Sequence, residues 1–140
     1  MFGAINFLAV TAAAVATFLV GALWYSPILF GKLWMKAHGY SEEKVKEMQK
    51  TATQAYITSF VCYLVMAVVF SVLMSYVYPD NTATATKGLQ LGFLMWLGFA
   101  ATIGLTANMF SEKSLSTYLI DVVYQLVYLL IMGAILGGWR

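Results

Sequence analysis

One carboxylate stands inside an otherwise uncharged apolar stretch near the end of the chain. Asp121 is the only charged residue in residues 115–139, and an ionisable group inside a membrane span is costly and suggests a function. Polar side chains recur around it at helical spacing, so they share one face of a helix. A second polar stripe lies on an earlier apolar stretch, residues 53–77. The candidate polar seam consists of Asp121, Tyr124, Gln125 and Tyr128 with Gln54, Thr58 and Tyr63.

Two interpretations of this seam are open. In the first, the seam is structural, because the last helix is predicted to begin near Ser116 and Asp121 then lies about 7 Å from that end at 1.5 Å per residue. The helix dipole and a lysine such as Lys113 would stabilise the carboxylate, and hydrogen bonds along the seam would hold helices together. In the second, the seam lines a path for protons or a small solute.

Other chemistries find no support in the sequence. The single cysteine, Cys62, excludes an intrachain disulfide and a cysteine-based metal site, and the single histidine, His38, is predicted to be a solvated or helix-end group. No serine-histidine-aspartate, Walker or Rossmann signature is present. A net charge of +2 with one lysine-rich loop argues against nucleic acid as a partner. We therefore expect no catalytic residue, no cofactor and no metal, and a protein that is not an enzyme.

The composition identifies the elements that must position the seam. Hydrophobic residues make up 61% and charged residues 10% of the 140-residue chain, against about 45–50% and about 25% in soluble domains. Eight of the fourteen charged residues lie in residues 32–50. The remaining stretches are long enough to cross a bilayer as helices. The sequence therefore predicts one all-α, polytopic membrane domain with spans at about 3–25, 53–77, 87–110 and 117–139.

A polar segment, residues 26–52, joins the first two spans. Ser26 and Pro27 predict the start of a short amphipathic helix that lies in the membrane interface. Ser41 predicts the start of a second helix. Because neither proline nor glycine lies between Ser41 and Tyr78, this second helix is predicted to continue without a break into the second span.

Lysine and arginine counts predict the orientation. The loop after the first span holds five lysines and the turn after the third span holds Lys113, whereas the opposite side holds Lys87 and Arg140. Positive residues favour the cytoplasmic side. We therefore expect both termini outside and the lysine-rich first loop in the cytoplasm.

A dense aromatic motif marks the end of the first span. We interpret it as a hinge at the inner interface: Trp24 and Tyr25 anchor among headgroups, Phe30 and Trp34 enter the acyl chains, and Lys32 meets phosphates. A lipid-headgroup or ligand site is the alternative. The motif residues are Trp24, Tyr25, Ser26, Pro27, Phe30, Gly31, Lys32 and Trp34.

This motif and the four-span layout resemble the family catalogued as domain of unknown function 1761, small bacterial and fungal membrane proteins with about four spans. The resemblance implies an integral protein of the plasma membrane, which in bacteria is the inner membrane. It brings no known activity, substrate or cofactor, and no functional residue.

Small residues four apart predict close helix packing in three spans. They begin with Ala9, Ala13 and Thr17, and recur as Gly88 with Gly92 and Gly133 with Gly137. We expect a homo-oligomer embedded in the lipid bilayer, as a non-enzymatic self-associating or accessory component, or as part of a larger membrane complex. The alternative is a small transporter or channel for protons or a small solute that uses the polar face around Asp121. An enzyme acting on lipid would lack a visible nucleophile–base pair.

Overall fold

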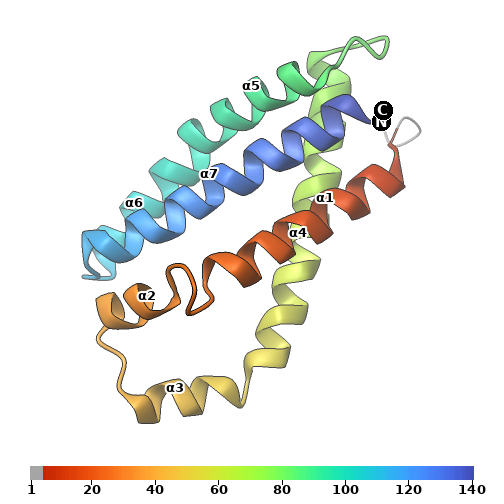
Figure 1. The fold of residues 1–140 in the computed structure, drawn as a ribbon. Helices are drawn as coiled ribbons and strands as arrows, with labels where there is room; N and C mark the ends of the chain where they lie inside the picture. The colour runs from red at the N-terminus through yellow and green to blue at the C-terminus, as the bar shows by residue number, and fades with distance from the viewer. Residues whose placement is uncertain (1–4) are drawn as a thin grey trace.

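The computed structural model describes residues 5–140, and every regular element in that part of the chain is a helix (Figure 1). Four helices are long and apolar enough to cross a membrane, at residues 7–24, 52–77, 85–110 and 115–138. Their bounds agree with the four predicted spans to within a few residues, although the predicted start of the first, Gly3, lies outside the described residues. The elements are α1 (Phe7–Trp24), α2 (Gly31–His38), α3 (Glu42–Gln49), α4 (Ala52–Val77), α5 (Ala85–Met95), the π-helical η1 (Trp96–Ala100), α6 (Ala101–Phe110) and α7 (Leu115–Gly138).

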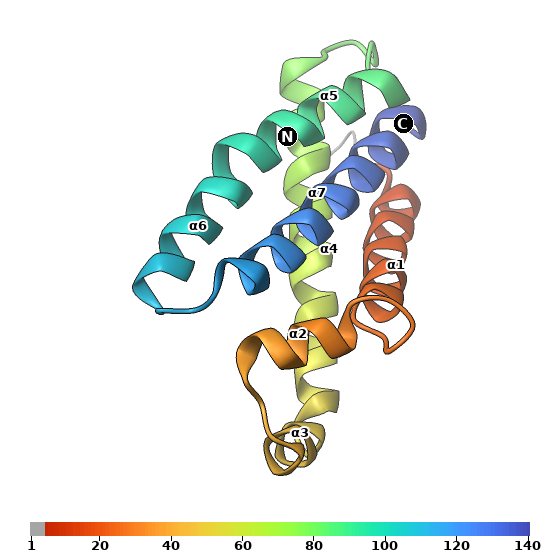
Figure 2. The same ribbon diagram turned by 60° about the vertical axis from the view of Figure 1, so that its left-hand side comes forward.

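Helix α7 is the centre of the arrangement. It packs against α1 and α4, and α5 runs along another part of its surface (Figures 1 and 2). The start of α1, the end of α7 and the loop between α4 and α5 lie at one end of the bundle, where the Asn6 side chain donates to the Trp139 carbonyl oxygen at 3.5 Å. At the other end lie α2 and the α6–α7 turn, where Ser114 Oγ donates to the Ala37 carbonyl oxygen at 3.4 Å.

The predicted small-residue stripes form packing faces inside one chain. On α1, Ala9, Ala13 and Thr17 are fully buried. On α5 and α7 the glycines allow the two backbones to touch: a Cβ on Gly88 would lie 1.7 Å from the carbonyl oxygen of Gly133. Only glycine allows so close an approach, and close packing of small residues is a main source of helix association in lipid.

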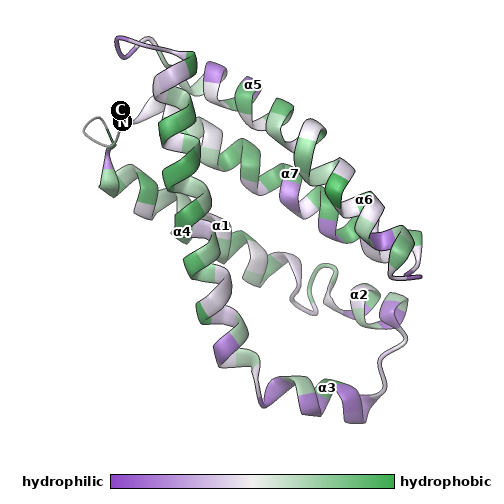
Figure 3. Ribbon diagram, turned by 180° about the vertical axis from the view of Figure 1, so that it is seen from behind, coloured by the Kyte–Doolittle hydropathy of each residue, from purple (hydrophilic) through white to green (hydrophobic). Residues whose placement is uncertain are grey.

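The predicted continuous helix from Ser41 to Tyr78 is wrong, because the chain breaks at Lys50 and Thr51. The backbone N–H groups of Lys50 and Thr51 donate to carbonyl oxygens only three residues earlier, those of Glu47 and Met48, which tightens the last turn of α3 and ends it. Hydrophilic residues gather on α3, whereas the four long helices are mainly hydrophobic (Figure 3). Because of the break, α3 runs in a different direction from α4 (Figure 1). The polar segment therefore does not extend along the axis of the second span.

Helix α2, which the sequence predicted to lie in the interface, also begins later than predicted. Ser26 is not its cap: the Ser26 hydroxyl donates to the Leu23 carbonyl oxygen at 2.6 Å, and residues 26–30 form a turn before α2 starts at Gly31. Gly31 is buried against that turn, and a Cβ there would lie 2.4 Å from the Tyr25 carbonyl oxygen. The glycine is therefore required for the chain to reverse tightly after α1.

Candidate functional site

The aromatic motif folds back onto α7 and meets Asp121. Tyr25 donates its hydroxyl to Asp121 Oδ1 at 2.5 Å, and Trp34 donates Nε1 to the same oxygen at 3.1 Å. Trp24 donates Nε1 to the carbonyl oxygen of Ile120, the preceding residue, at 3.0 Å. Two features that the sequence analysis treated separately, the motif and the lone carboxylate, thus form one site.

This geometry corrects the expected role of the motif. Trp24 and Tyr25, predicted as headgroup anchors, and Trp34, predicted to enter the acyl chains, all donate hydrogen bonds to α7. Phe30 packs on the Trp24 ring, with the ring centroids 4.6 Å apart, and so supports the turn. Only Lys32 keeps the exposed position that contact with phosphates would need.

One further aromatic residue, absent from the predicted site, binds the backbone of α7 next to Asp121. Trp96 of η1 donates Nε1 to the carbonyl oxygen of Val122 at 2.8 Å. The residues before and after Asp121 therefore each accept an indole N–H, from α1 and from η1. Single-turn π-helical segments inside α-helices are frequent at functional sites. The sequence gives little indication of this contact, because Trp96 is only a lone tryptophan in the third span.

A cavity of about 190 Å³ opens beside Asp121, between α2, α6, the α6–α7 turn and α7. Two buried polar atoms in its lining side chains, His38 Nε2 and Gln125 Oε1, have no hydrogen-bond partner among the described residues. A buried unpaired polar atom costs about 1–3 kcal/mol. The polar lining consists of His38, Asn108, Ser111, Lys113, Thr117, Tyr118, Asp121 and Gln125.

The electrostatics of the cavity favour a neutral imidazole at its edge. Desolvation lowers the pKa of His38 below 6.5, and the positive charge of Lys113 lowers it further, while Asp121 partly opposes the shift. Asp121 receives its hydrogen bonds from a phenol and an indole, which are uncharged. The carboxylate is therefore oriented by its partners but not neutralised by them.

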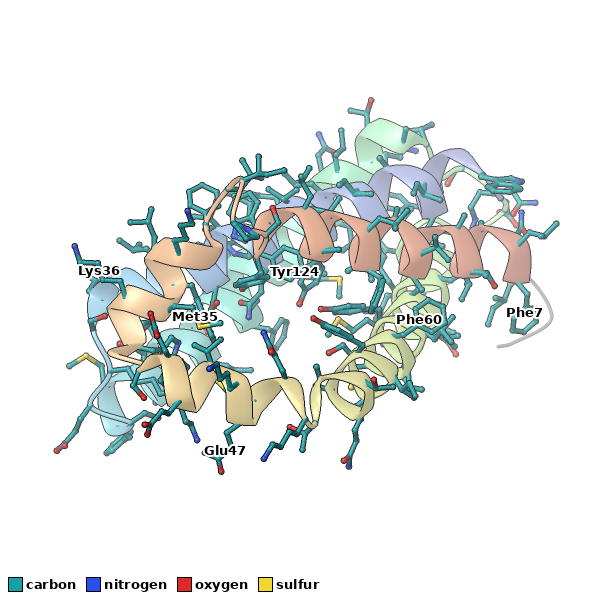
Figure 4. The ribbon with its side chains drawn as sticks, turned by 60° about the horizontal axis from the view of Figure 1, so that its bottom comes forward. Phe7, Met35, Lys36, Glu47, Phe60 and Tyr124 are labelled. Carbon is teal, nitrogen blue, oxygen red and sulfur yellow. The ribbon has the colours of Figure 1, made fainter. Side chains whose placement is uncertain are left out.

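The part of the predicted seam on α7 faces the interior. Tyr124 and Tyr128 are buried, and the Tyr124 hydroxyl donates to the Thr17 carbonyl oxygen at 3.0 Å. That hydroxyl also lies 3.1 Å from the hydroxyl of Tyr63, so α1, α4 and α7 meet at this tyrosine (Figure 4). The structure thus brings Tyr124, Tyr128 and Tyr63 together in the interior, and Asp121 and Gln125 together at the cavity.

The rest of the predicted seam lies elsewhere. Gln54 and Thr58 are exposed on α4, as is Cys62. At about 100° per residue, Gln54 and Thr58 lie about 180° and about 140° around the helix from Tyr63. The tyrosine points inward, whereas Gln54, Thr58 and Cys62 point outward. These outward residues do not contribute to the site.

Removing the Tyr25 hydroxyl tests how tightly the motif is tied to α7. Tyr25→Phe is expected to lower the free energy of unfolding by about 1 kcal/mol, because Asp121 loses a charge-assisted hydrogen bond. The loss should shrink in an Asp121→Leu background, where the acceptor is absent. Thermal unfolding of the four proteins in detergent measures both effects.

The control is Tyr76→Phe, which changes an exposed tyrosine of α4 in the same way. Equal effects of Tyr25→Phe in the presence and absence of the Asp121 carboxylate would show that the hydrogen bond contributes nothing.

The chain matches one family model over residues 8–137, that of the protein of unknown function family DUF1761. Because the match covers nearly the whole chain, the protein belongs to this family, as the resemblance implied. No curated protein and no solved structure matches the chain.

Proposed function

We propose that this member of the DUF1761 family is a small, non-enzymatic protein of the plasma membrane that binds a polar solute beside Asp121 and moves it, or a proton, across the bilayer. The observation that carries the proposal is the shared acceptor: Tyr25 and Trp34 both donate to Asp121 Oδ1 at the wall of a polar cavity. Residues far apart in the chain therefore orient one charged group beside a space that a solute can occupy.

The structural interpretation of Asp121 has less support. The residue lies six positions after Leu115, where α7 begins, and the effect of the helix dipole falls off within the first turn. Its hydrogen-bond donors are Tyr25 and Trp34 and not the lysine that this interpretation expects. Holding helices together does not require a charge at this depth, because a neutral acceptor could also take both donors without the cost of burying a carboxylate.

Transport by the purified protein in liposomes tests the proposal. Light scattering follows the swelling caused by entry of small polar solutes, and a trapped pH-sensitive dye follows protons. We expect at least one of these fluxes to exceed that of protein-free liposomes and to require Asp121. If none does, the protein is not a transporter of these solutes and the proposal fails.

In this proposal the cavity opens to the cytoplasm, because the lysine-rich segment with α2 and α3 lies at the same end of the bundle. In a Cys62→Ala background, an impermeant maleimide added outside the cell is expected to label Thr86→Cys but not Lys46→Cys, both exposed positions. Disrupting the cells should make Lys46→Cys reactive. External labelling of Lys46→Cys but not of Thr86→Cys would show that the orientation is the reverse of the one proposed.

Self-association is a second proposal, and the packing of the helices favours it. Helix α4 packs on α1 and α7, whereas α5 and α6 pack on α7, so a single chain does not surround a path along its length. A second copy would complete such a path. The small-residue stripes are buried within the chain, so they are not free to pack against a second copy. Native mass measurement in mild detergent is expected to show a homo-oligomer; monomers at every concentration would contradict it.

A further inference from the structure

We infer that the cavity beside Asp121 binds the ammonium group of a small organic amine. The inference rests on the proposed solute site and names the class of solute that its charges and acceptors fit.

The first step is the charge that the hydrogen bonds leave in place. Asp121 Oδ1 accepts from Tyr25 and Trp34, both neutral donors. Within residues 5–140, Asp121 Oδ2 accepts no hydrogen bond, and no ion pair joins Asp121 to Lys113, although both residues line the cavity. A carboxylate that is partly removed from water and lacks an opposite charge is unfavourable. A bound cation would therefore stabilise this carboxylate more than a neutral or anionic ligand would.

The second step is the number of free acceptors. Gln125 Oε1 is buried without a partner, and so is His38 Nε2, which accepts a hydrogen bond when the imidazole is neutral with its proton on Nδ1. The lowered pKa of His38 is consistent with the neutral form. A primary ammonium carries three N–H donors. The lining offers three acceptors for them, on Asp121, Gln125 and His38.

The third step separates an amine from a bare ion. The cavity measures about 190 Å³, whereas a single water needs only about 10–15 Å³ of such space. Its lining also includes carbon surfaces from Gly104, Ala107 and Val122, which suit the methylene groups of an amine. In residues 5–140 no group of three or more histidine, cysteine or acidic side chains is placed to hold a metal ion.

Two sources could supply this ammonium group: a free amine such as ethanolamine, or the headgroup of a phosphatidylethanolamine that enters from the bilayer. Lys113 is exposed and lines the same cavity, so its ammonium group is available to pair with the phosphate of such a headgroup. The chemistry at Asp121 is the same for both sources.

Calorimetric titration of the protein in phosphatidylglycerol nanodiscs tests the inference with three probes of similar size and different charge: ethanolamine, ethylene glycol and glycolate. We expect saturable binding of ethanolamine, at least about tenfold tighter than that of the other two. Asp121→Asn and, separately, Gln125→Leu should each weaken it by about tenfold or more. The matched control is Glu112→Gln, which removes a carboxylate that is exposed and lies outside the lining.

Nanodiscs that contain phosphatidylethanolamine distinguish the sources. Weaker apparent binding of ethanolamine there, with this lipid enriched around the wild type over Asp121→Asn, identifies the headgroup; unchanged binding identifies the free amine. Either result supports the ammonium site.

Four results would overturn the inference. Tighter binding of glycolate that is lost in Lys113→Gln would make the cavity an anion site. Ethanolamine binding that survives both Asp121→Asn and Gln125→Leu would place the amine elsewhere. No ethanolamine binding, together with an Asp121-dependent flux of a neutral solute, would reject the ammonium ligand and leave the proposed transport standing, whereas absence of both binding and flux would reject both.

Discussion

Gly88→Ala is expected to lower the free energy of unfolding by at least about 2 kcal/mol, because the α5–α7 interface has no room for a methyl group. The new Cβ would lie 1.7 Å from the carbonyl oxygen of Gly133. That oxygen belongs to the backbone of α7, so it can move only if the helix moves. Separating the two helices would also weaken the close packing that holds them together in lipid.

The control for this prediction is Gly98→Ala, in the same span. No heavy atom lies within 4 Å of the position that its Cβ would take. Alanine favours a helix over glycine by up to about 1 kcal/mol, so this variant should be neutral or slightly stabilised. Thermal unfolding in detergent compares the two. Equal stability of the two variants would mean that α5 and α7 do not pack through their glycines.

Hydrophobic composition was sufficient to predict the four long helices. A run of about 20 uncharged apolar residues has few alternatives to a spanning helix, since the backbone must satisfy its own hydrogen bonds in lipid. The face of α7 was predictable for a related reason. Asp121, Tyr124, Gln125 and Tyr128 fall within about 100° of one another around the helix. In the structure the two tyrosines are buried, and Asp121 and Gln125 line the cavity beside them.

The site itself was not predictable, because its two halves lie far apart in the chain. Tyr25 and Asp121 are 96 residues apart, and nothing local marks them as partners. Tryptophan and tyrosine at the end of a span are commonly interface anchors, so the motif was assigned to the lipid. Tertiary packing turned these side chains inward instead.

Two further errors, besides the predicted cap at Ser26, concerned local geometry. The break between α3 and α4 has no proline or glycine to announce it, and tightened hydrogen bonds at Lys50 and Thr51 produce it. The polar stripe on α4 joined residues that a helix directs to different sides, Tyr63 inward and Gln54 and Thr58 outward. A stricter use of 100° per residue would have separated them.

Asp121→Asn is expected to abolish the protein-dependent flux and leave the fold intact. Asparagine keeps an oxygen that can accept from both Tyr25 and Trp34, so the aromatic motif stays docked on α7. What disappears is the negative charge beside the cavity. Because only the charge changes, stability should stay within about 0.5 kcal/mol of the wild type.

If Asp121 were only a structural group, the same substitution would have the opposite effects on stability and on flux. Stability would fall by about 0.5–1 kcal/mol, as an electrostatic interaction at a helix end is lost, and flux would not change. Glu112→Gln, which removes an exposed carboxylate of the α6–α7 turn, controls for net charge and should change neither property.

The most direct test of a solute site at Asp121 is therefore a paired measurement on Asp121→Asn, its melting in detergent and its solute and proton flux in liposomes. We predict unchanged melting with flux reduced to that of protein-free liposomes. Lowered melting with undiminished flux would contradict the account and make Asp121 a structural tie between the aromatic motif and α7.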